Sequence, residues 1–162
     1  MPDVVVPLTI RDLTRDDLPA CAWSGSPRHL AGIARMLDLP GHGEVEYLVA
    51  CPPSGLPVAI GSIDYKPSPG AGLLWQLAVQ PALQSCGIGT ALIQEAEQRI
   101  RGRNLDRAEL RVEEWNARAR TLYERLGYVA YGSRPEAWDE QAEDGSVFRY
   151  ETVLIMMRKE LR

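Results

Sequence analysis

The stretch that decides the fold of this 162-residue chain is Gln84-Ser85-Cys86-Gly87-Ile88-Gly89-Thr90-Ala91-Leu92. It follows an apolar, strand-like run, Leu73 to Val79, and opens a helix-like run, Gly87 to Arg101. A strand that ends at a glycine-rich turn and continues as a helix leaves several backbone N–H groups without partners, at the positive end of the helix dipole. Because these donors suit phosphate oxygens, the stretch predicts binding of a pyrophosphate-bearing cofactor.

The length of the chain predicts a single domain over residues 1–162 with a full hydrophobic core. Its 45% hydrophobic and 25% charged residues are typical of a soluble globular protein. No apolar run approaches the roughly 20 residues that cross a bilayer, and the N-terminus does not resemble a signal peptide. The cysteines, at irregular spacing, indicate free thiols in a reducing compartment. We therefore expect a cytoplasmic protein with no membrane partner.

The composition disfavours both metal and nucleic-acid binding. The chain has no Cys-x-x-Cys pair and only His29 and His42 as imidazoles, so we expect no metal site. A net charge of −4 argues against nucleic acid as a partner. One segment is rich in arginine despite the negative net charge of the chain. It is either a solvated helix end and loop or a source of contacts to a cofactor phosphate. Its members are Arg99, Arg101, Arg103, Arg107 and Arg111.

Hydrophobic periodicity predicts an α+β fold with the order β-α-α-β-β-β-α-β-α-β-β. The expected strands are Val4–Ile10, Glu44–Cys51, Pro57–Tyr65, Leu73–Val79, Arg107–Glu113, Tyr128–Arg134 and Val147–Arg158. The expected helices are Thr14–Trp23, His29–Leu37, Gly87–Arg101 and Asn116–Leu126, with a break at Pro40-Gly41-His42-Gly43. The short turns favour an antiparallel meander, and the middle strand–helix–strand unit a parallel crossover. The result is an α/β three-layer sandwich, with a mixed, mostly antiparallel sheet of about seven strands and helices on both faces.

Two common phosphate-binding motifs do not fit the glycine-rich turn. A Walker P-loop needs Gly-Lys-Ser/Thr, whereas this chain has Gly-Thr-Ala. A dinucleotide fingerprint needs a third small residue where Leu92 stands, and the preceding strands form a meander.

A third pattern fits the turn. Gln84-x-x-Gly87-x-Gly89, after a strand and at the start of a helix, resembles the pyrophosphate loop of the GNAT superfamily of acyl-CoA-dependent N-acyltransferases. Leu77-Ala78-Val79 followed by Pro81 resembles the cofactor-binding strand of that family. Asn116, then Leu122-Tyr123-Glu124-Arg125-Leu126-Gly127-Tyr128, resembles its later strand–helix segment. The resemblance covers nearly the whole chain and is specific from about Leu73 to Tyr128.

The resemblance implies acetyl-CoA as cosubstrate and a tyrosine that protonates the departing thiolate. That tyrosine is Tyr123, and the alternative is that its ring only packs beside Leu122 and Leu126. Asn116 is either a cofactor contact or only a helix cap. The cosubstrate would bind Leu77, Ala78, Val79, Gln84, Ser85, Cys86, Gly87, Ile88, Gly89, Thr90, Asn116 and Tyr123.

The general base is not fixed by the resemblance. Some family members place a glutamate where this chain has Arg111, which puts that base in doubt. Glu113 and Asp64 are the candidate substitutes, with Glu46 as a third, and each is otherwise a surface or rim carboxylate. Cys86 has no neighbouring histidine in the sequence to activate it as a nucleophile.

The function that the resemblance implies is transfer of an acetyl group to a primary amine by direct attack in a ternary complex. The acceptor is a small-molecule amine or a peptide amine. The alternatives are a protein N-terminal or lysine acetyltransferase, and a non-catalytic acyl-CoA-binding sensor. We expect the acceptor pocket between residues 23–43 and 131–148, where aromatic side chains and an acidic hairpin occur. The long Val147–Arg158 strand favours a homodimer.

Overall fold

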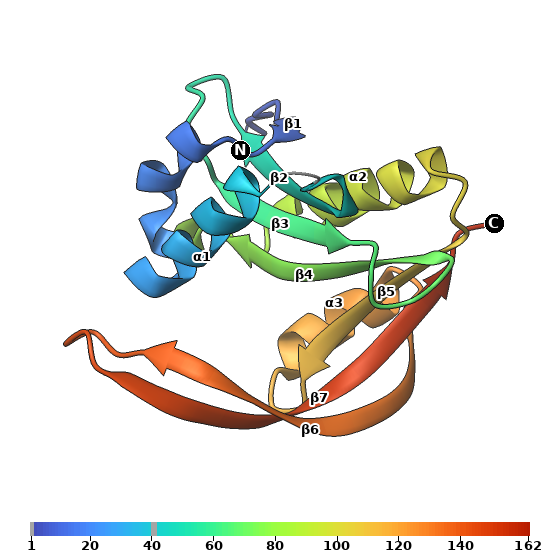
Figure 1. Ribbon diagram of the computed structural model, residues 1–162. Coiled ribbons are helices and arrows are strands. Elements are labelled where there is room, and N and C mark those ends of the chain that lie inside the picture. Colours follow the sequence, from blue (N-terminus) through green and yellow to red (C-terminus); the bar gives the residue numbers. More distant parts are fainter. Residues whose placement is uncertain (1, 40–41) are drawn as a thin grey trace.

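Seven strands of the computed structural model, which describes residues 2–39 and 42–162, form one sheet (Figure 1). The strands are β1 (Thr9–Asp12), β2 (Val45–Cys51), β3 (Ala59–Asp64), β4 (Ala71–Val79), β5 (Arg107–Glu113), β6 (Val129–Gln141) and β7 (Val147–Glu160). The α-helices are α1 (Pro27–Asp38), α2 (Ile88–Gly102) and α3 (Ala117–Arg125). Short 3₁₀ helices are η1 (Arg15–Ser24), η2 (His42–Glu44) and η3 (Pro81–Leu83).

The sheet is mixed and mostly antiparallel, as the sequence predicts. Its strand order is β1-β2-β3-β4-β5-β7-β6, and only the β4–β5 pair is parallel. Helix α2 makes the crossover between these two strands, because a parallel pair cannot be joined by a tight turn.

Helices cover both faces of the sheet (Figure 1). Helices α2 and α3 pack on one face, around a cluster that includes Leu74, Ile93 and Leu110. Helix α1 and η1 pack on the other face, around a cluster that includes Ile33, Val49 and Ile60. The predicted three-layer arrangement is therefore confirmed.

The predicted first strand is wrong in its bounds. β1 begins at Thr9, and residues 2–8 form no strand. Its only partner among the described strands is β2, and Thr9 already lies opposite Cys51, the last residue of that strand. Val4, Val5 and Val6 therefore have no strand to pair with and stay exposed.

The predicted first helix is a 3₁₀ helix, η1. Its start is as expected, because the Thr14 N–H donates to Asp17 Oδ2 at 2.8 Å. Pro19 stands inside it and donates no backbone hydrogen bond. Of the predicted break after α1, Pro40 and Gly41 lie outside the described residues.

The last hairpin is longer than predicted. β6 continues past Arg134 to Gln141, and its register runs from Val129 opposite Arg158 to Gln141 opposite Val147. Pro135 does not end it, because β6 is the edge strand of the sheet and needs no outer hydrogen bond there. The predicted Asp144-Gly145 turn is present, with Gly145 at φ +88°.

Strands β4 and β5 part midway, which opens the sheet beside α3. Their pairing runs from Ala71 opposite Arg107 to Leu74 opposite Leu110 and then stops. β4 continues to Val79 with its β5-facing edge unpaired. Within the described residues, no helix is long and apolar enough to cross a membrane.

Candidate active site

A bulge in β4 sits where the two central strands part. The β3–β4 register shifts between Ile60 opposite Ala78 and Ser62 opposite Trp75. Gln76, inside the shift, has φ +55°, a left-handed conformation that costs a residue with a Cβ about 1–3 kcal/mol. Gly61 faces the bulge, and a Cβ there would lie 2.6 Å from Leu77 Cδ2. The bulge bends β4 away from β5, and Gly61 makes room for it.

The glycine-rich turn ends β4 and starts α2 with unpaired donors. The first α2 ladder bond runs from the Ala91 N–H to the Gly87 carbonyl, at 3.1 Å. The N–H groups of Ile88, Gly89 and Thr90 therefore have no partner within the helix. Gly87 has φ +85°, and no atom lies within 4 Å of where a Cβ would be. An anion could approach this turn without a steric obstacle.

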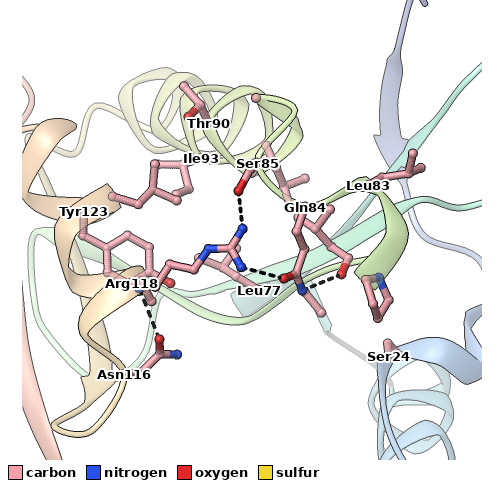
Figure 2. Close-up of a pocket in the computed structure, with 18 of the residues that line it drawn as sticks. Ser24, Leu77, Leu83, Gln84, Ser85, Thr90, Ile93, Asn116, Arg118 and Tyr123 are labelled. Atoms are coloured by element: carbon pink, nitrogen blue, oxygen red, sulfur yellow. Dashed lines mark hydrogen bonds between the residues drawn. The ribbon is translucent and has the colours of Figure 1, made fainter.

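One arginine reaches the turn from the opposite helix. Arg118, on α3, hydrogen-bonds through Nη2 to Ser85 Oγ and through Nη1 to Gln84 Oε1 (Figure 2). Gln84 Nε2 in turn donates to the Val79 carbonyl at 3.4 Å. The guanidinium thus crosses the opening between α2 and α3.

A cavity of about 780 Å³ lies between α2 and α3, and we call it the α2–α3 cavity (Figure 2). Its lining includes ten of the predicted cofactor residues: Leu77, Ala78, Val79, Gln84, Ser85, Gly87, Gly89, Thr90, Asn116 and Tyr123. Cys86 and Ile88 are not among the lining residues, and Cys86 is exposed with its thiol 3.7 Å from the Gln84 carbonyl.

A second cavity, of about 720 Å³, lies on the far side of the parting strands, and we call it the α1–β5 cavity. Residues of α1, β4, β5 and the β6–β7 hairpin line it, among them His29, Trp75, Glu113 and Trp138. The two cavities share four lining residues, which mark the junction between them: Leu77, Asn116, Ala119 and Tyr123.

Tyr123 stands at this junction as a protonated phenol. Burial raises the pKa of its hydroxyl above the ordinary value of 10.0. That hydroxyl has no hydrogen-bond partner among residues 2–39 and 42–162. Asn116 caps α3, since its Oδ1 accepts from the Ala119 N–H at 3.2 Å. The predicted cap is thus confirmed, and Asn116 also lines both cavities, whereas its predicted contact with the cofactor stays a prediction.

Two buried oxygens of the α1–β5 cavity lack donors. Glu113 Oε1, on β5, and Gln76 Oε1, on β4, are buried without a hydrogen-bond partner in the described structure. They come from the two strands that part, so both flank the opening. A buried acceptor without a donor is costly, and an incoming N–H group would satisfy it.

The other predicted bases lie elsewhere. Asp64, at the end of β3, lines neither cavity, and its Oδ1 accepts from the Lys66 N–H at 3.0 Å. Glu46 pairs with Arg99 and Arg103. Of the three carboxylates that the sequence offers as the base, only Glu113 lines one of these two cavities.

The arginine-rich segment is mostly structural. Arg101 and Arg107 bind the carbonyls of Leu161 and Pro69, and Arg111 alone of the segment lines a cavity. The arginines that line the α2–α3 cavity are Arg118 and Arg125, which sequence reasoning missed. No group of three or more metal-ligating side chains occurs in the part of the chain that is described.

Comparisons with known proteins identify the family and the fold. The model of the acetyltransferase (GNAT) family matches residues 10–128. The structure superimposes on the ribosomal-protein-S18-alanine N-acetyltransferase of Escherichia coli with a TM-score of 0.73, at 22% identity over 96% of this chain and 94% of that one. It superimposes on the PaiA N-acetyltransferase of Thermoplasma acidophilum, solved with coenzyme A, with a TM-score of 0.64, at 15% identity over 95% and 99% of the chains.

A mycothiol acetyltransferase of Beutenbergia cavernae is 45% identical over 63 residues. This segment is 39% of the present chain and 21% of that relative, so the chain matches about a fifth of its length. The family match spans most of the chain and includes the glycine-rich turn. The protein belongs to the acetyltransferase (GNAT) family.

Proposed function

We propose that the protein transfers an acetyl group from acetyl-CoA to a primary amine by direct attack in a ternary complex. One observation carries this proposal: two cavities on opposite sides of the parted strands meet at Tyr123. A cosubstrate in one cavity and an acceptor in the other would bring thioester and amine together there.

The α2–α3 cavity fits acetyl-CoA. The free N–H groups at the start of α2 and the Arg118 guanidinium would hold the pyrophosphate. The unpaired edge of β4, from Trp75 to Val79, would pair with the pantetheine amides like an added strand. A backbone N–H near Val79 would stabilise the oxyanion that forms during attack.

Glu113 is the general base in this proposal. A lysine-type amine has a pKa of about 10.4, so it must lose a proton before it can attack at neutral pH. Glu113 Oε1 would take that proton, and Gln76 Oε1 would hold a second N–H of the amine. Asp64 is left out because it lies outside both cavities.

Tyr123 is the general acid. The amine nitrogen bonds to the thioester carbonyl carbon, the carbon–sulfur bond breaks, and Tyr123 gives its proton to the departing thiolate. A phenol is protonated at neutral pH, and burial raises the pKa of Tyr123 above its ordinary value of 10.0. The products are the acetylated amine and free CoA.

The sensor alternative and the protein-acceptor alternative both remain testable. A sensor would bind acetyl-CoA without turnover, whereas a protein acetyltransferase would prefer peptides. The test is a thiol-release assay with acetyl-CoA against small amines, amino acids and peptides. Release of CoA that depends on the amine supports the proposal, and binding of acetyl-CoA with no release from any amine overturns it.

Two further expectations are part of this proposal. Cys21, Cys51 and Cys86 are free thiols, which supports a reducing, cytoplasmic compartment. The edge strand β6 and its neighbour β7 expose apolar side chains, Val129, Tyr131, Val147 and Phe148, which supports a homodimer. A sedimentation mass equal to the 18.0 kDa chain would contradict the dimer.

A further inference from the structure

Most charged side chains of the α1–β5 cavity already have partners. The β6–β7 hairpin contributes three acidic side chains to the wall. Each of them accepts a hydrogen bond or forms an ion pair. The pairs are Arg28–Asp139, Arg134–Glu136 and Trp138–Glu140. Glu136 and Asp139 thus have a cationic partner each, and Glu140 accepts a hydrogen bond from the neutral Trp138 indole, so none of the three carboxylates lacks a partner.

Among the arginines and carboxylic acids of the cavity wall, three side chains have no hydrogen bond or ion pair with any described residue: Arg35, Arg111 and Glu113. Arg35 belongs to α1, and the other two belong to β5. The unpaired groups are thus two cations and one anion. A ligand with one ammonium and one anionic group would pair with Glu113 and with one of the two arginines, whereas a simple alkylamine would leave both arginines unpaired.

The order of these groups along β5 gives the ligand a direction. Arg111 and Glu113 are two residues apart, so they share a sheet face about 6.6 Å apart along the strand. The Glu113 carbonyl accepts from the Asn116 N–H at 2.8 Å, and Asn116 lines both cavities. Arg111 lines only the α1–β5 cavity. Glu113 therefore lies next to the junction, and Arg111 lies two residues farther along β5 from it.

We propose that the acceptor is an amino carboxylate with an apolar side chain, such as a free amino acid, and that Arg111 selects it. This rests on the proposed function. The amine lies against Glu113 and Gln76 at the junction, and the carboxylate binds Arg111. A guanidinium matches a carboxylate with two parallel hydrogen bonds, which makes the contact strong and directional. The apolar part packs against Trp75 and Trp138 of the wall. The product is the N-acetylated amino acid.

The test is the thiol-release assay with each of the twenty L-amino acids and its amide. The amide keeps the amine and side chain and lacks the carboxylate charge; its amine also has a lower pKa, so the two acceptors are compared at a pH where both amines are neutral. We expect wild-type kcat/KM for the best amino acid to exceed that for its amide by about 10- to 100-fold. Arg111→Gln removes this preference by raising KM for the acid, with kcat little changed, because the carboxylate contact is made equally in the ground and transition states.

Arg158→Gln is the matched control. Arg158 lies on β7, on the same sheet face, where it stacks on the Tyr131 ring at 4.9 Å and lines neither cavity. This variant keeps the preference for the acid. Arg111→Glu reverses it, so that the amide becomes the better acceptor.

Two outcomes overturn this inference and leave the proposed function standing. One is that amides react as well as acids, and the other is that Arg111→Gln lowers kcat/KM equally for the acid and for the amide. If no amine of any kind releases CoA, the proposed function itself fails and this inference falls with it. The two failures are therefore distinguishable.

Discussion

The rings of Tyr123 and Tyr128 meet edge to face, with centroids 6.4 Å apart and planes inclined by 64°, yet their hydroxyls have opposite surroundings. The Tyr128 hydroxyl donates to the buried Glu97 Oε2 at 2.8 Å, and Lys159 Nζ binds the same carboxylate at 3.0 Å. Tyr123 lines both cavities at their junction, and its hydroxyl has no hydrogen-bond partner among the described residues. One tyrosine holds the fold together, and the other is available to a substrate.

Tyr123→Phe will lower kcat by at least about tenfold, because proton transfer by a positioned acid contributes 10²- to 10⁴-fold in typical enzymes. Its unfolding free energy and its affinity for acetyl-CoA will stay close to wild type, since the lost hydroxyl makes no hydrogen bond within the fold. Steady-state kinetics, calorimetry with acetyl-CoA and urea unfolding measure the three quantities. Unchanged kcat would remove Tyr123 from the chemistry.

Tyr128→Phe is the matched control and will show the reverse pattern. Loss of the hydrogen bond to Glu97 leaves a buried carboxylate less well satisfied, which costs about 1–3 kcal/mol of unfolding free energy. Its kcat will stay within about twofold of wild type below the melting transition. A large kcat loss in this variant would mean that packing, rather than proton donation, explains the effect at Tyr123.

The sequence predicts much of this arrangement because its signals are local. Strand β5 has the predicted bounds, since Ala108, Leu110 and Val112 alternate with charged residues. The turn before α2 is predicted because its glycines, spaced two apart, lie between two regular elements. The family resemblance then supplies Tyr123, which the structure places at the cavity junction.

The features that sequence reasoning missed depend on contacts between distant segments. Arg118 lies 33 residues from Ser85, and nothing in its helix indicates that it reaches back to that turn. The sequence predicts Gln76 as an ordinary strand residue, and its positive φ is seen only in the folded structure. The extension of β6 depends on pairing with β7, which overrides the local signal of Pro135.

Arg118→Ala will weaken acetyl-CoA binding about tenfold, because a charge-assisted hydrogen bond contributes about 1.5–3 kcal/mol. Arg118 lines the α2–α3 cavity and its guanidinium contacts Ser85 in the turn before α2, where a phosphate held by the α2 N-terminus would lie. Isothermal titration with CoA at two salt concentrations measures the loss, which will shrink at high salt through screening.

Arg120→Ala is the control for charge on the same helix. Arg120 pairs with Glu124 at 2.9 Å and lines neither cavity, so CoA affinity will be nearly unchanged. If both variants lose CoA affinity equally, the effect comes from the overall positive charge of α3. That result would contradict a direct role for Arg118.

Glu113→Gln will lower kcat/KM about 10²- to 10⁴-fold at neutral pH, since the amide cannot accept the proton of the attacking amine. The deficit will shrink as the pH rises towards the pKa of the acceptor, about 10.4 for a lysine-type amine, because the amine is then already neutral. A pH profile of kcat/KM for wild type and variant measures this convergence. The control is Glu114→Gln, whose side chain is exposed and lines neither cavity. A deficit that is equal at every pH would point to substrate positioning instead of proton transfer.

The Arg11–Asp17 pair makes stability depend on acid pH. Asp17 binds Arg11 through both oxygens at 2.8 Å, and the hydrogen bonds from Arg11, assisted by the Thr14 N–H, lower the pKa of Asp17 from 3.8 to about 2. Because the folded-state pKa lies below that of the unfolded chain, the unfolded state takes up the proton first. The contribution of this pair is therefore complete above about pH 4 and is lost as the pH falls towards about 2.

Asp17→Asn will reduce the unfolding free energy at neutral pH by about 1–2 kcal/mol and will reduce its decline in acid. Urea unfolding at about pH 6 and about pH 3 measures both effects, and the difference between wild type and variant will narrow at the lower pH. Asp16→Asn is the control, because Asp16 is exposed and neither effect is expected there. If the wild-type and Asp17→Asn curves stay parallel in acid, the carboxylate does not hold its low pKa through Arg11, and η1 is anchored to β1 by packing alone.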